Sequence, residues 1–185
     1  DPAFCHRFRL RHRRNPPLLG FFDIFCNISF IPTLEAPNRI PPGRFSLQLD
    51  HGDGDFMSLG CRHGLVLIYL RKRLQILVWD PVTADQHRLA IPPGVAACGG
   101  KTPINGAVLR APGDVQHFQV VLVVRHSDDE QHTRVIACVY SSKTGLWGDP
   151  ISTLFPYQAV EADVFSFATL ISTNVAVLAG DSLHW

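Results

Sequence analysis

One short unit occurs twice in this chain, and each copy follows a run of apolar, β-branched residues. The first copy is Trp79-Asp80-Pro81-Val82-Thr83-Ala84-Asp85, and the second, 61 residues later, is Tyr140-Ser141-Ser142-Lys143-Thr144-Gly145-Leu146-Trp147. Each copy has an aromatic residue, three residues that favour turns, a threonine and then a small residue. Such a unit predicts a strand that enters a tight turn. Its recurrence indicates a repeat architecture of small β-sheets, which presents its loops to binding partners.

Short apolar runs separated by Gly, Pro, Asp and Ser predict strands along most of the chain. The expected strands are Phe45–Leu49, Gly64–Leu70, Gln75–Trp79, His87–Ile91, Ala107–Arg110, Phe118–Val124, Val135–Tyr140, Val164–Ile171 and Val175–Ala179. Strands of this length and spacing indicate an antiparallel all-β fold. Because the aromatic unit recurs, a partial β-propeller of about three blades is favoured over a sandwich. Residues 181–185 are expected to be the second strand of a hairpin, so the chain is expected to end inside a domain.

The first residues of the chain predict a short amphipathic helix with a basic surface. Asp1-Pro2 is a typical helix start, and Asn15-Pro16-Pro17 ends the helix after Arg14. Five of the 17 basic residues lie in this segment, a pattern that fits either phosphate contacts with nucleic acid or a solvated helix face. The apolar Phe4 and Phe8 require packing, which favours the solvated face, so nucleic acid is not an expected partner. An extended segment is expected from Leu18 to Ile31.

The cysteine count and the apolar runs exclude several classes of protein. Five cysteines without a C-x-x-C pair support neither a disulfide framework nor a structural zinc site, and they indicate reduced thiols in a cytoplasmic or nuclear compartment. No apolar run approaches the roughly 18 residues of a membrane helix, so no membrane partner is expected. With 46% apolar residues, the chain has enough apolar side chains to fill a core.

Gly180-Asp181-Ser182-Leu183 resembles the nucleophile block of GDSL-type esterases, with Ser182 as the candidate nucleophile. A serine hydroxyl requires a positioned base, and His184 lies two residues away on the same predicted strand. That position is poorly suited to a catalytic base. The pattern therefore favours a hairpin turn over an active site.

Three weaker signals also have structural interpretations. Asp50, Asp53 and Asp55 lack the spacing and the closing Glu of an EF-hand, so a solvated loop is favoured over a calcium site. The nine histidines contain no metal-binding arrangement, and scattered hydrogen-bonded side chains are expected. Gly99-Gly100-Lys101-Thr102 lacks the earlier glycine of a phosphate-binding loop. We therefore expect no metal site, no cofactor and no catalytic residues, and we expect the aromatic residues of the repeated unit to pack between blades.

Seven segments, in order along the chain, carry a further signal. They are Asp1–Arg9, Pro16–Phe22, Cys61–Leu67, Val78–Thr83, Leu89–Pro93, Val139–Trp147 and Leu178–Trp185. Together these segments resemble plant F-box proteins of the grass type, which carry an F-box-associated, kelch-like β-propeller. The first segment is similar to the last helix of an F-box, and the second is similar to the connector that follows it.

The resemblance implies a substrate-recognition subunit of an SCF-type ubiquitin ligase, without catalysis of its own. In such proteins the F-box binds a Skp-type adaptor and the downstream domain selects the protein to be ubiquitinated. On this basis residues 1–17 are the end of an F-box-like helix with its connector, and residues 18–185 are a truncated F-box-associated propeller-like domain. The front of the F-box is not in this sequence, so adaptor binding is expected only with an upstream F-box. Two alternatives remain open, an esterase that uses Ser182 and a propeller-like interaction scaffold unrelated to ubiquitination.

Overall fold

The structure is a computed structural model of the 185-residue chain. It describes residues 18–23, 28–50, 53–96, 104–111, 114, 116–127, 133–155, 176–179 and 182–184. The predicted N-terminal helix, the boundary after residue 17 and the predicted strand Val164–Ile171 lie outside these residues. The chain divides into two compact units, residues 1–48 and 49–185. No helix within the described ranges is long and apolar enough to cross a membrane.

The first unit is built around one short hairpin. Strand β1 (Gly20–Asp23) pairs antiparallel with β2 (Ser29–Pro32), inside the segment that was predicted to be extended. The buried Phe30 of β2 packs edge-to-face on Phe45, with ring centroids 4.8 Å apart. Phe45 ends a 3-10 turn, η1 (Pro42–Phe45), whose prolines favour helical backbone angles at its start. The predicted strand Phe45–Leu49 is therefore wrong, and none of the described strands pairs with this segment.

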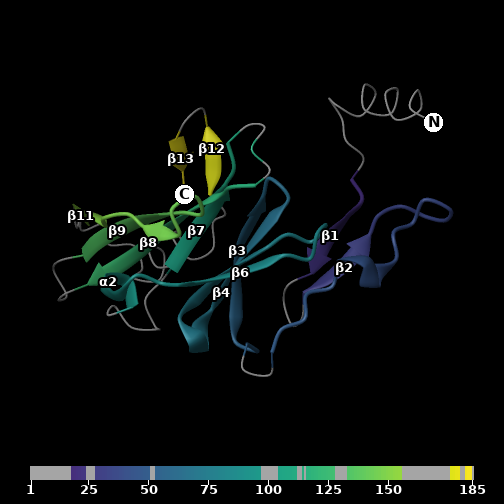
Figure 1. Ribbon diagram of the computed structural model, residues 1–185, viewed down its shortest axis with the longest axis horizontal. Helices are drawn as coiled ribbons and strands as arrows, with labels where there is room; N and C mark the ends of the chain where they lie inside the picture. Colours follow the sequence, from purple (N-terminus) through teal and green to yellow (C-terminus); the bar gives the residue numbers. More distant parts are fainter. Residues whose placement is uncertain are drawn as a thin grey trace, which may run out of the picture. The chain divides into compact units, whose positions relative to one another are not determined.

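The first sheet of the second unit is a four-stranded antiparallel meander (Figure 1). Its strands, in chain order and in sheet order, are β3 (Phe56–Arg62), β4 (Leu65–Leu70), β5 (Gln75–Trp79) and β6 (Gln86–Ala90). The last three were predicted within a residue or two of their observed bounds. Strand β3 was missed because a β-bulge between Ser58 and Gly60 shifts its register, which interrupts the two-residue alternation that marks a strand. A 3-10 turn, η2 (Arg71–Arg73), joins β4 to β5.

The second sheet repeats this plan. Its strands are β7 (Ile104–Leu109), β8 (Gln119–Ser127), β9 (Thr133–Ser141), β10 (Leu146–Trp147) and β11 (Ile151–Phe155). Both β10 and β11 pair with β9, so together they form one outer strand, interrupted at Gly148-Asp149-Pro150. This outer strand was not predicted because proline and glycine divide it into two short pieces. A one-turn helix, α2 (Pro93–Ala96), lies on the connection between the sheets.

A short hairpin follows the second sheet in the chain. Strand β12 (Val177–Ala179) pairs antiparallel with β13 (Ser182–His184), which confirms the predicted C-terminal hairpin. The guanidinium group of Arg62, at the end of β3, donates a hydrogen bond to the carbonyl oxygen of Ala176 at 2.7 Å. This bond connects the hairpin to the first sheet.

The two large sheets pack face to face through alternate positions of their strands. The side chains that meet in the shared core include Leu65, Leu67, Tyr69, Ile76, Val78, Val120, Leu122, Val124 and Cys138. Each fully buried Leu or Ile contributes about 1.5–3 kcal/mol to folding. Strand β7 approaches the first sheet at Gly106, where a Cβ atom would lie 2.7 Å from the carbonyl oxygen of Val121 and 3.3 Å from the Leu67 side chain.

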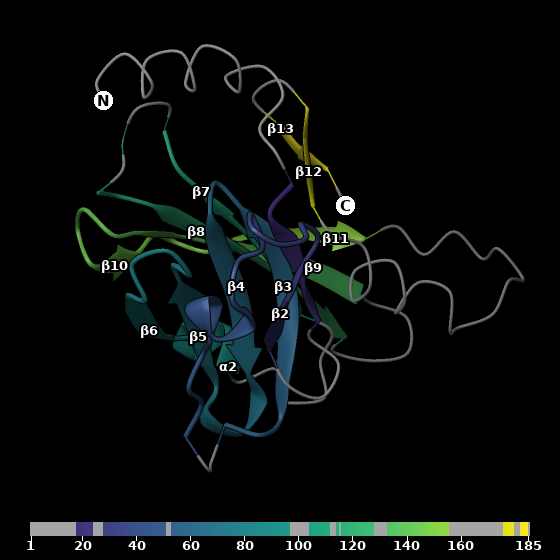
Figure 2. The same ribbon diagram turned by 90° about the vertical axis from the view of Figure 1, so that its right-hand side faces the viewer.

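The first strands of the two sheets, β3 and β7, lie next to each other, and the later strands follow outward in order (Figure 2). Successive antiparallel sheets that meet at their first strands and stack on one face form the blade arrangement of a β-propeller. The chain is thus all-β, with antiparallel sheets arranged as a partial propeller. The predicted fold class is confirmed.

A buried carboxylate joins three segments of the first sheet. The side chain of Asp53, which precedes β3, is fully buried, and its two oxygens lie 2.6 Å from Arg73 Nε and 3.0 Å from Arg88 Nη2. Asp50 lies 3.5 Å from Arg73 and 3.7 Å from Arg88, while its main-chain N–H donates to Asp53. The prediction of a solvated loop is therefore wrong for Asp53. Two arginine side chains compensate its charge.

We expect Asp53→Asn to lower the free energy of unfolding by about 1–3 kcal/mol. The amide keeps the size of the side chain, but it removes the negative charge that two arginine side chains share. The matched control is Asp55→Asn, because Asp55 is exposed and lies 3.8 Å from Arg71. Loss of this surface pair is expected to change stability by less than about 0.5 kcal/mol. Urea denaturation of both variants measures the difference, and equal effects would contradict a structural role of the buried carboxylate.

Candidate functional site: the loop end of the two sheets

The candidate site is one end of the two sheets, which we call the loop end. It contains the two turns of the repeated unit, residues 80–85 between β5 and β6 and residues 141–146 from the last residue of β9 to the first residue of β10. We call these the first and the second repeat turn. The described part of the β7–β8 loop, which includes Arg110 and Asp114, lies at the same end because it contacts both turns.

The first repeat turn is held by hydrogen bonds of its own side chains. Asp80 Oδ1 accepts the main-chain N–H groups of Val82 at 2.9 Å and Thr83 at 3.3 Å. The main-chain N–H of Ala84 donates to the carbonyl oxygen of Asp80 at 2.8 Å, which closes a five-residue turn. The Thr83 hydroxyl donates to the Asp85 carboxylate at 2.8 Å. An aspartate at the first position of a turn commonly satisfies main-chain donors in this way.

The second repeat turn uses equivalent bonds. The main-chain N–H of Gly145 donates to the carbonyl oxygen of Ser141 at 2.9 Å, as Ala84 donates to Asp80 in the first repeat turn. Thr144 Oγ1 accepts the main-chain N–H two residues later at 3.4 Å, and Thr83 Oγ1 does the same at 3.3 Å. The prediction that each unit is a strand entering a tight turn is confirmed at this level of detail.

The fifth residue of each turn has a left-handed backbone conformation. The φ angle is 69° at Ala84 and 71° at Gly145. Glycine adopts this conformation without a steric penalty, whereas an alanine costs about 1–2 kcal/mol there. The first repeat turn therefore holds a strained residue where the second holds the residue that suits the conformation.

The aromatic residues of the repeated unit are structural groups: Trp79 is buried, and Tyr140 and Trp147 are partly buried. Tyr140 and Trp147 pack against the shared core, with ring centroids 5.4 Å apart, and Trp147 Nε1 donates to the carbonyl oxygen of Ala90 at 2.8 Å. This bond runs from the second sheet to the end of β6 in the first sheet. It confirms packing between blades for Tyr140 and Trp147. Trp79 is 1% exposed and lies outside the shared core.

Side chains of the β7–β8 loop link the two repeat turns. Arg110 lies 3.7 Å from the Asp80 carboxylate in the first repeat turn, and Lys143 of the second repeat turn lies 3.8 Å from Asp114. The main-chain N–H of His117 donates a hydrogen bond to the Asp114 carboxylate. This bond is the main reason why the pKa of the Asp114 carboxyl group lies below its ordinary value. This bond stabilises the loop at neutral pH, and the contribution is lost as the pH falls through the lowered pKa. Sequence reasoning did not single out Arg110 or Asp114.

Among the described residues, the structure brings no catalytic base to Ser182. Ser182 and His184 are exposed residues at the two ends of β13, and within the described residues no hydrogen bond joins them. Side chains two apart on a strand stand on the same face about 6.6 Å from each other. Asp181 lies outside the described residues. The hairpin interpretation of this segment agrees with the pairing of Ala179 with Ser182.

The other sequence candidates form no cluster. Among the described residues, no group of three or more His, Cys, Asp or Glu side chains could hold a metal ion. His132, the Gly99–Thr102 loop and the basic segment 1–14 lie outside those residues. Cys61 and Cys138 are free thiols, and burial raises the pKa of the Cys138 thiol. A raised pKa keeps this thiol protonated and unreactive at neutral pH.

Comparison with protein families decides the class of the chain. Residues 41–170, which are 130 of the 185 residues, match the family described as "F-box protein At3g26010-like, beta-propeller". The chain belongs to this family. Comparison with curated proteins and with solved structures gave no match.

The family match contains both large sheets and both repeat turns, whereas Ser182 lies outside it. Propellers of F-box proteins are protein-binding modules, and the family assigns that general role to this domain. The loop end is consistent with such a role because each repeat turn exposes a large apolar side chain. Val82 and Leu146 are each 67% exposed.

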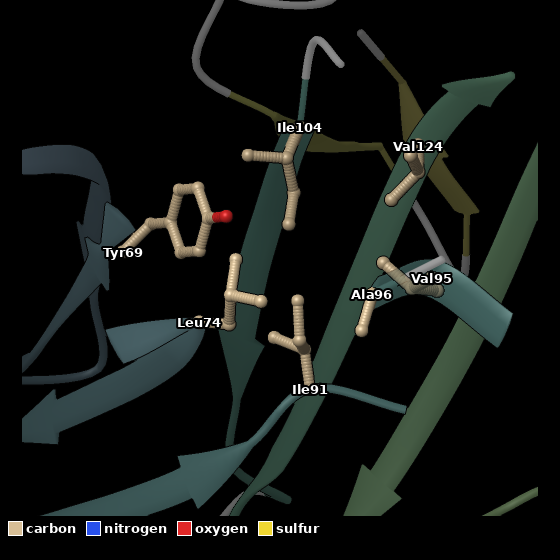
Figure 3. A pocket seen from close by; sticks show the side chains of 7 residues that line it. All are labelled: Tyr69, Leu74, Ile91, Val95, Ala96, Ile104 and Val124. Carbon is tan, nitrogen blue, oxygen red and sulfur yellow. The ribbon is translucent and has the colours of Figure 1, made fainter. Parts of the chain in front are cut away.

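A small cavity lies between the sheets (Figure 3), and none of its lining residues belongs to the repeat turns. Its lining is formed by Tyr69, Leu74, Ile91, Val95, Ala96, Ile104 and Val124. The volume open to a water-sized molecule is about 10 Å³, which holds at most one water. Burial raises the pKa of the Tyr69 hydroxyl, the polar side-chain group of this lining. The cavity is too small for a ligand, so the surface of the loop end remains the candidate site.

The two repeat turns provide a reciprocal test of backbone strain. Ala84→Gly is expected to raise the free energy of unfolding by about 0.5–1 kcal/mol, because relief of the left-handed alanine exceeds the entropy cost of glycine. Gly145→Ala is expected to lower it by about 1 kcal/mol, and no atom lies within 4 Å of the added Cβ to obscure the effect. Thermal and urea unfolding measure both changes. A destabilised Ala84→Gly variant would contradict the equivalence of the two turns.

Proposed function

We propose that this chain recognises a protein target through the loop end, as the substrate-recognition part of an SCF-type ubiquitin ligase. The observation that carries the proposal is the construction of the two repeat turns. Each turn is fixed by side-chain to main-chain hydrogen bonds, and each presents an exposed apolar side chain beside polar groups. Family membership supports the assignment to F-box proteins.

Fixed loops suit recognition because binding then orders few groups. Immobilising a flexible side chain or loop at an interface costs about 0.5–1.5 kcal/mol for each side chain. Folding already restricts the main chain of the repeat turns, because the Asp80 and Thr144 side chains hold it by hydrogen bonds. Binding therefore loses less conformational entropy at these turns. Val82 and Leu146 supply apolar contact area, and Lys143 supplies a solvated positive charge that selects between targets by charge.

Ligase chemistry in this proposal belongs to other subunits. A Skp-type adaptor binds an F-box that precedes the propeller, and the propeller holds the target near the ubiquitin-transferring enzyme. The chain itself needs no cofactor for this role. We place it in the cytoplasm or the nucleus, where its thiols stay reduced.

Adaptor capture separates the ligase proposal from a propeller-like scaffold unrelated to ubiquitination. The comparison uses the 185-residue chain and a version extended upstream by its own preceding sequence, each incubated with a purified Skp-type adaptor. The extended version is expected to bind the adaptor, while the shorter chain is expected to bind far less. Failure of an extended version that contains an F-box would contradict the ligase role and favour the scaffold.

Target binding through the loop end is tested with a surface variant. Val82→Asp combined with Leu146→Asp is expected to remove protein targets captured by the extended chain in cells, because charges at both tips disrupt apolar contacts. The matched control is Val177→Asp, since Val177 is 61% exposed and lies on the C-terminal hairpin. Quantitative mass spectrometry compares the captured proteins, and circular dichroism verifies the fold. An unchanged set of targets would show that recognition uses another surface.

A further inference from the structure

The second repeat turn contains two main-chain donors whose equivalents in the first repeat turn bind a carboxylate. In the first repeat turn, the N–H groups of Val82 and Thr83 both donate to Asp80 Oδ1, at 2.9 and 3.3 Å. The equivalent N–H groups of the second repeat turn belong to Lys143 and Thr144. Neither of them has a hydrogen-bond partner in the described part of the chain. The same pair of donors is thus used in one turn and open in the other.

The two turns have the same backbone, so this comparison is between equivalent atoms. One main-chain hydrogen bond closes each five-residue turn, and the fifth residue is left-handed in both, with φ angles of 69° and 71°. The flanking strand residues also pair in the same way, Trp79 with Gln86 and Tyr140 with Trp147. The turns differ in their first residue, because Ser141 has no carboxylate to offer the donors. The first repeat turn therefore shows what kind of group this backbone binds.

The second repeat turn also carries an available positive charge. The Lys143 side chain is 64% exposed, and its ammonium group lies 3.8 Å from the Asp114 carboxylate. Asp114 does not depend on this pair, because it accepts the main-chain N–H groups of Gln116 and His117 at 3.0 and 2.9 Å. An exposed ion pair of this kind contributes little to stability. The ammonium group can therefore pair with another anion at small cost.

The two turns present opposite charges at the loop end. The second repeat turn, Ser-Ser-Lys-Thr-Gly-Leu, contains no acidic residue, whereas the first contains Asp80 and Asp85. Asp85 is exposed and accepts the Thr83 hydroxyl at 2.8 Å. An anion that approaches the loop end is attracted by the second repeat turn and repelled by the first.

We propose that the second repeat turn binds the side-chain carboxylate of an aspartate or glutamate in the protein target. The N–H groups of Lys143 and Thr144 are the donors, and the Lys143 ammonium group supplies the opposite charge. The inference rests on the proposed role of the loop end and names the chemistry of its partner. Successive main-chain N–H groups in a turn form anion sites, and charge-assisted hydrogen bonds are the stronger ones. Leu146, which is 67% exposed, adds apolar contact, so the preferred target segment has an apolar residue beside the acid.

Acetate is the probe for this site, and the first repeat turn is its internal control. In NMR titrations of the isotope-labelled chain at constant ionic strength, acetate is expected to shift the amide proton signals of Lys143 and Thr144 in a saturable way. The signals of Val82 and Thr83 are expected to stay in place, because Asp80 already accepts their hydrogen bonds. Chloride in place of acetate measures the effect of salt alone.

Ser141→Asp gives the second repeat turn the residue that fills the first. The new carboxylate is expected to accept both N–H groups, so that acetate no longer shifts their signals. Capture of protein targets by the chain extended upstream is expected to fall at least about fivefold, because the target's carboxylate loses its donors. Gln86→Asp is the matched control, since it adds the same charge beside the first repeat turn, and it is expected to leave capture unchanged.

Several outcomes would overturn the inference. Equal shifts in both turns, or no saturable shift in the second, would exclude the carboxylate site. A response to phosphate but not to acetate would favour a phosphorylated target instead. Capture that Ser141→Asp leaves unchanged, while Val82→Asp with Leu146→Asp removes it, would keep recognition at the loop end but exclude this site. Unchanged capture by all these variants would contradict the proposed function itself. Circular dichroism verifies that each variant is folded.

Discussion

Face-to-face packing of the two large sheets is the interaction on which the rest of the structure depends. It relies on strand alternation, because alternate residues of β4 and β5 point toward β8 and β9. A one-residue slip in any of these strands would turn its apolar set away from the shared core. Gly106 fits the crowded first strand of the second sheet, where a Cβ atom would collide with the Val121 carbonyl oxygen of its own sheet and lie 3.3 Å from Leu67 of the first sheet. The loops stand at one end because the register holds the strands in these positions.

The two sheets are variations on one plan, and the differences between them are informative. Both end their third strand in an aromatic residue and a five-residue turn with the same pattern of main-chain and threonine hydrogen bonds. The first turn gains an aspartate that accepts two main-chain N–H groups, while the second gains a glycine in the left-handed position. Each turn thus has one favourable residue that its counterpart lacks. The same backbone is reached through different local chemistry.

Local patterns could be predicted from the sequence, whereas features that depend on distant partners could not. The repeat turns and strands β4, β5 and β6 were predicted because turn residues and apolar runs are sufficient evidence for them. Strand β3 was hidden by its bulge, and β7 was predicted to begin after Gly106, since glycine normally weakens a strand. The same limit applies to Asp53. It resembles a solvated loop residue because its partners Arg73 and Arg88 are distant in the sequence, Arg88 by 35 residues.

The candidate site was predictable only in outline. The resemblance to F-box proteins indicated loops of a propeller, and the family match agrees with that architecture. The contacts of Arg110 with Asp80 and of Lys143 with Asp114 join segments that no sequence pattern relates. These ion pairs could not be predicted, because only the folded arrangement of the two sheets brings the charged side chains together.

The hydrogen bond from Trp147 to Ala90 has a consequence for how the domain opens. Outer strands usually have the lowest local stability of a sheet and exchange their amide protons through independent fraying. Here a side chain of one outer strand holds a main-chain oxygen of the other, 57 residues away in the sequence. Detaching the edge of the first sheet therefore disturbs the edge of the second. We therefore expect the outer edges of the two blades to open together, although none of the described strands runs from one blade to the other.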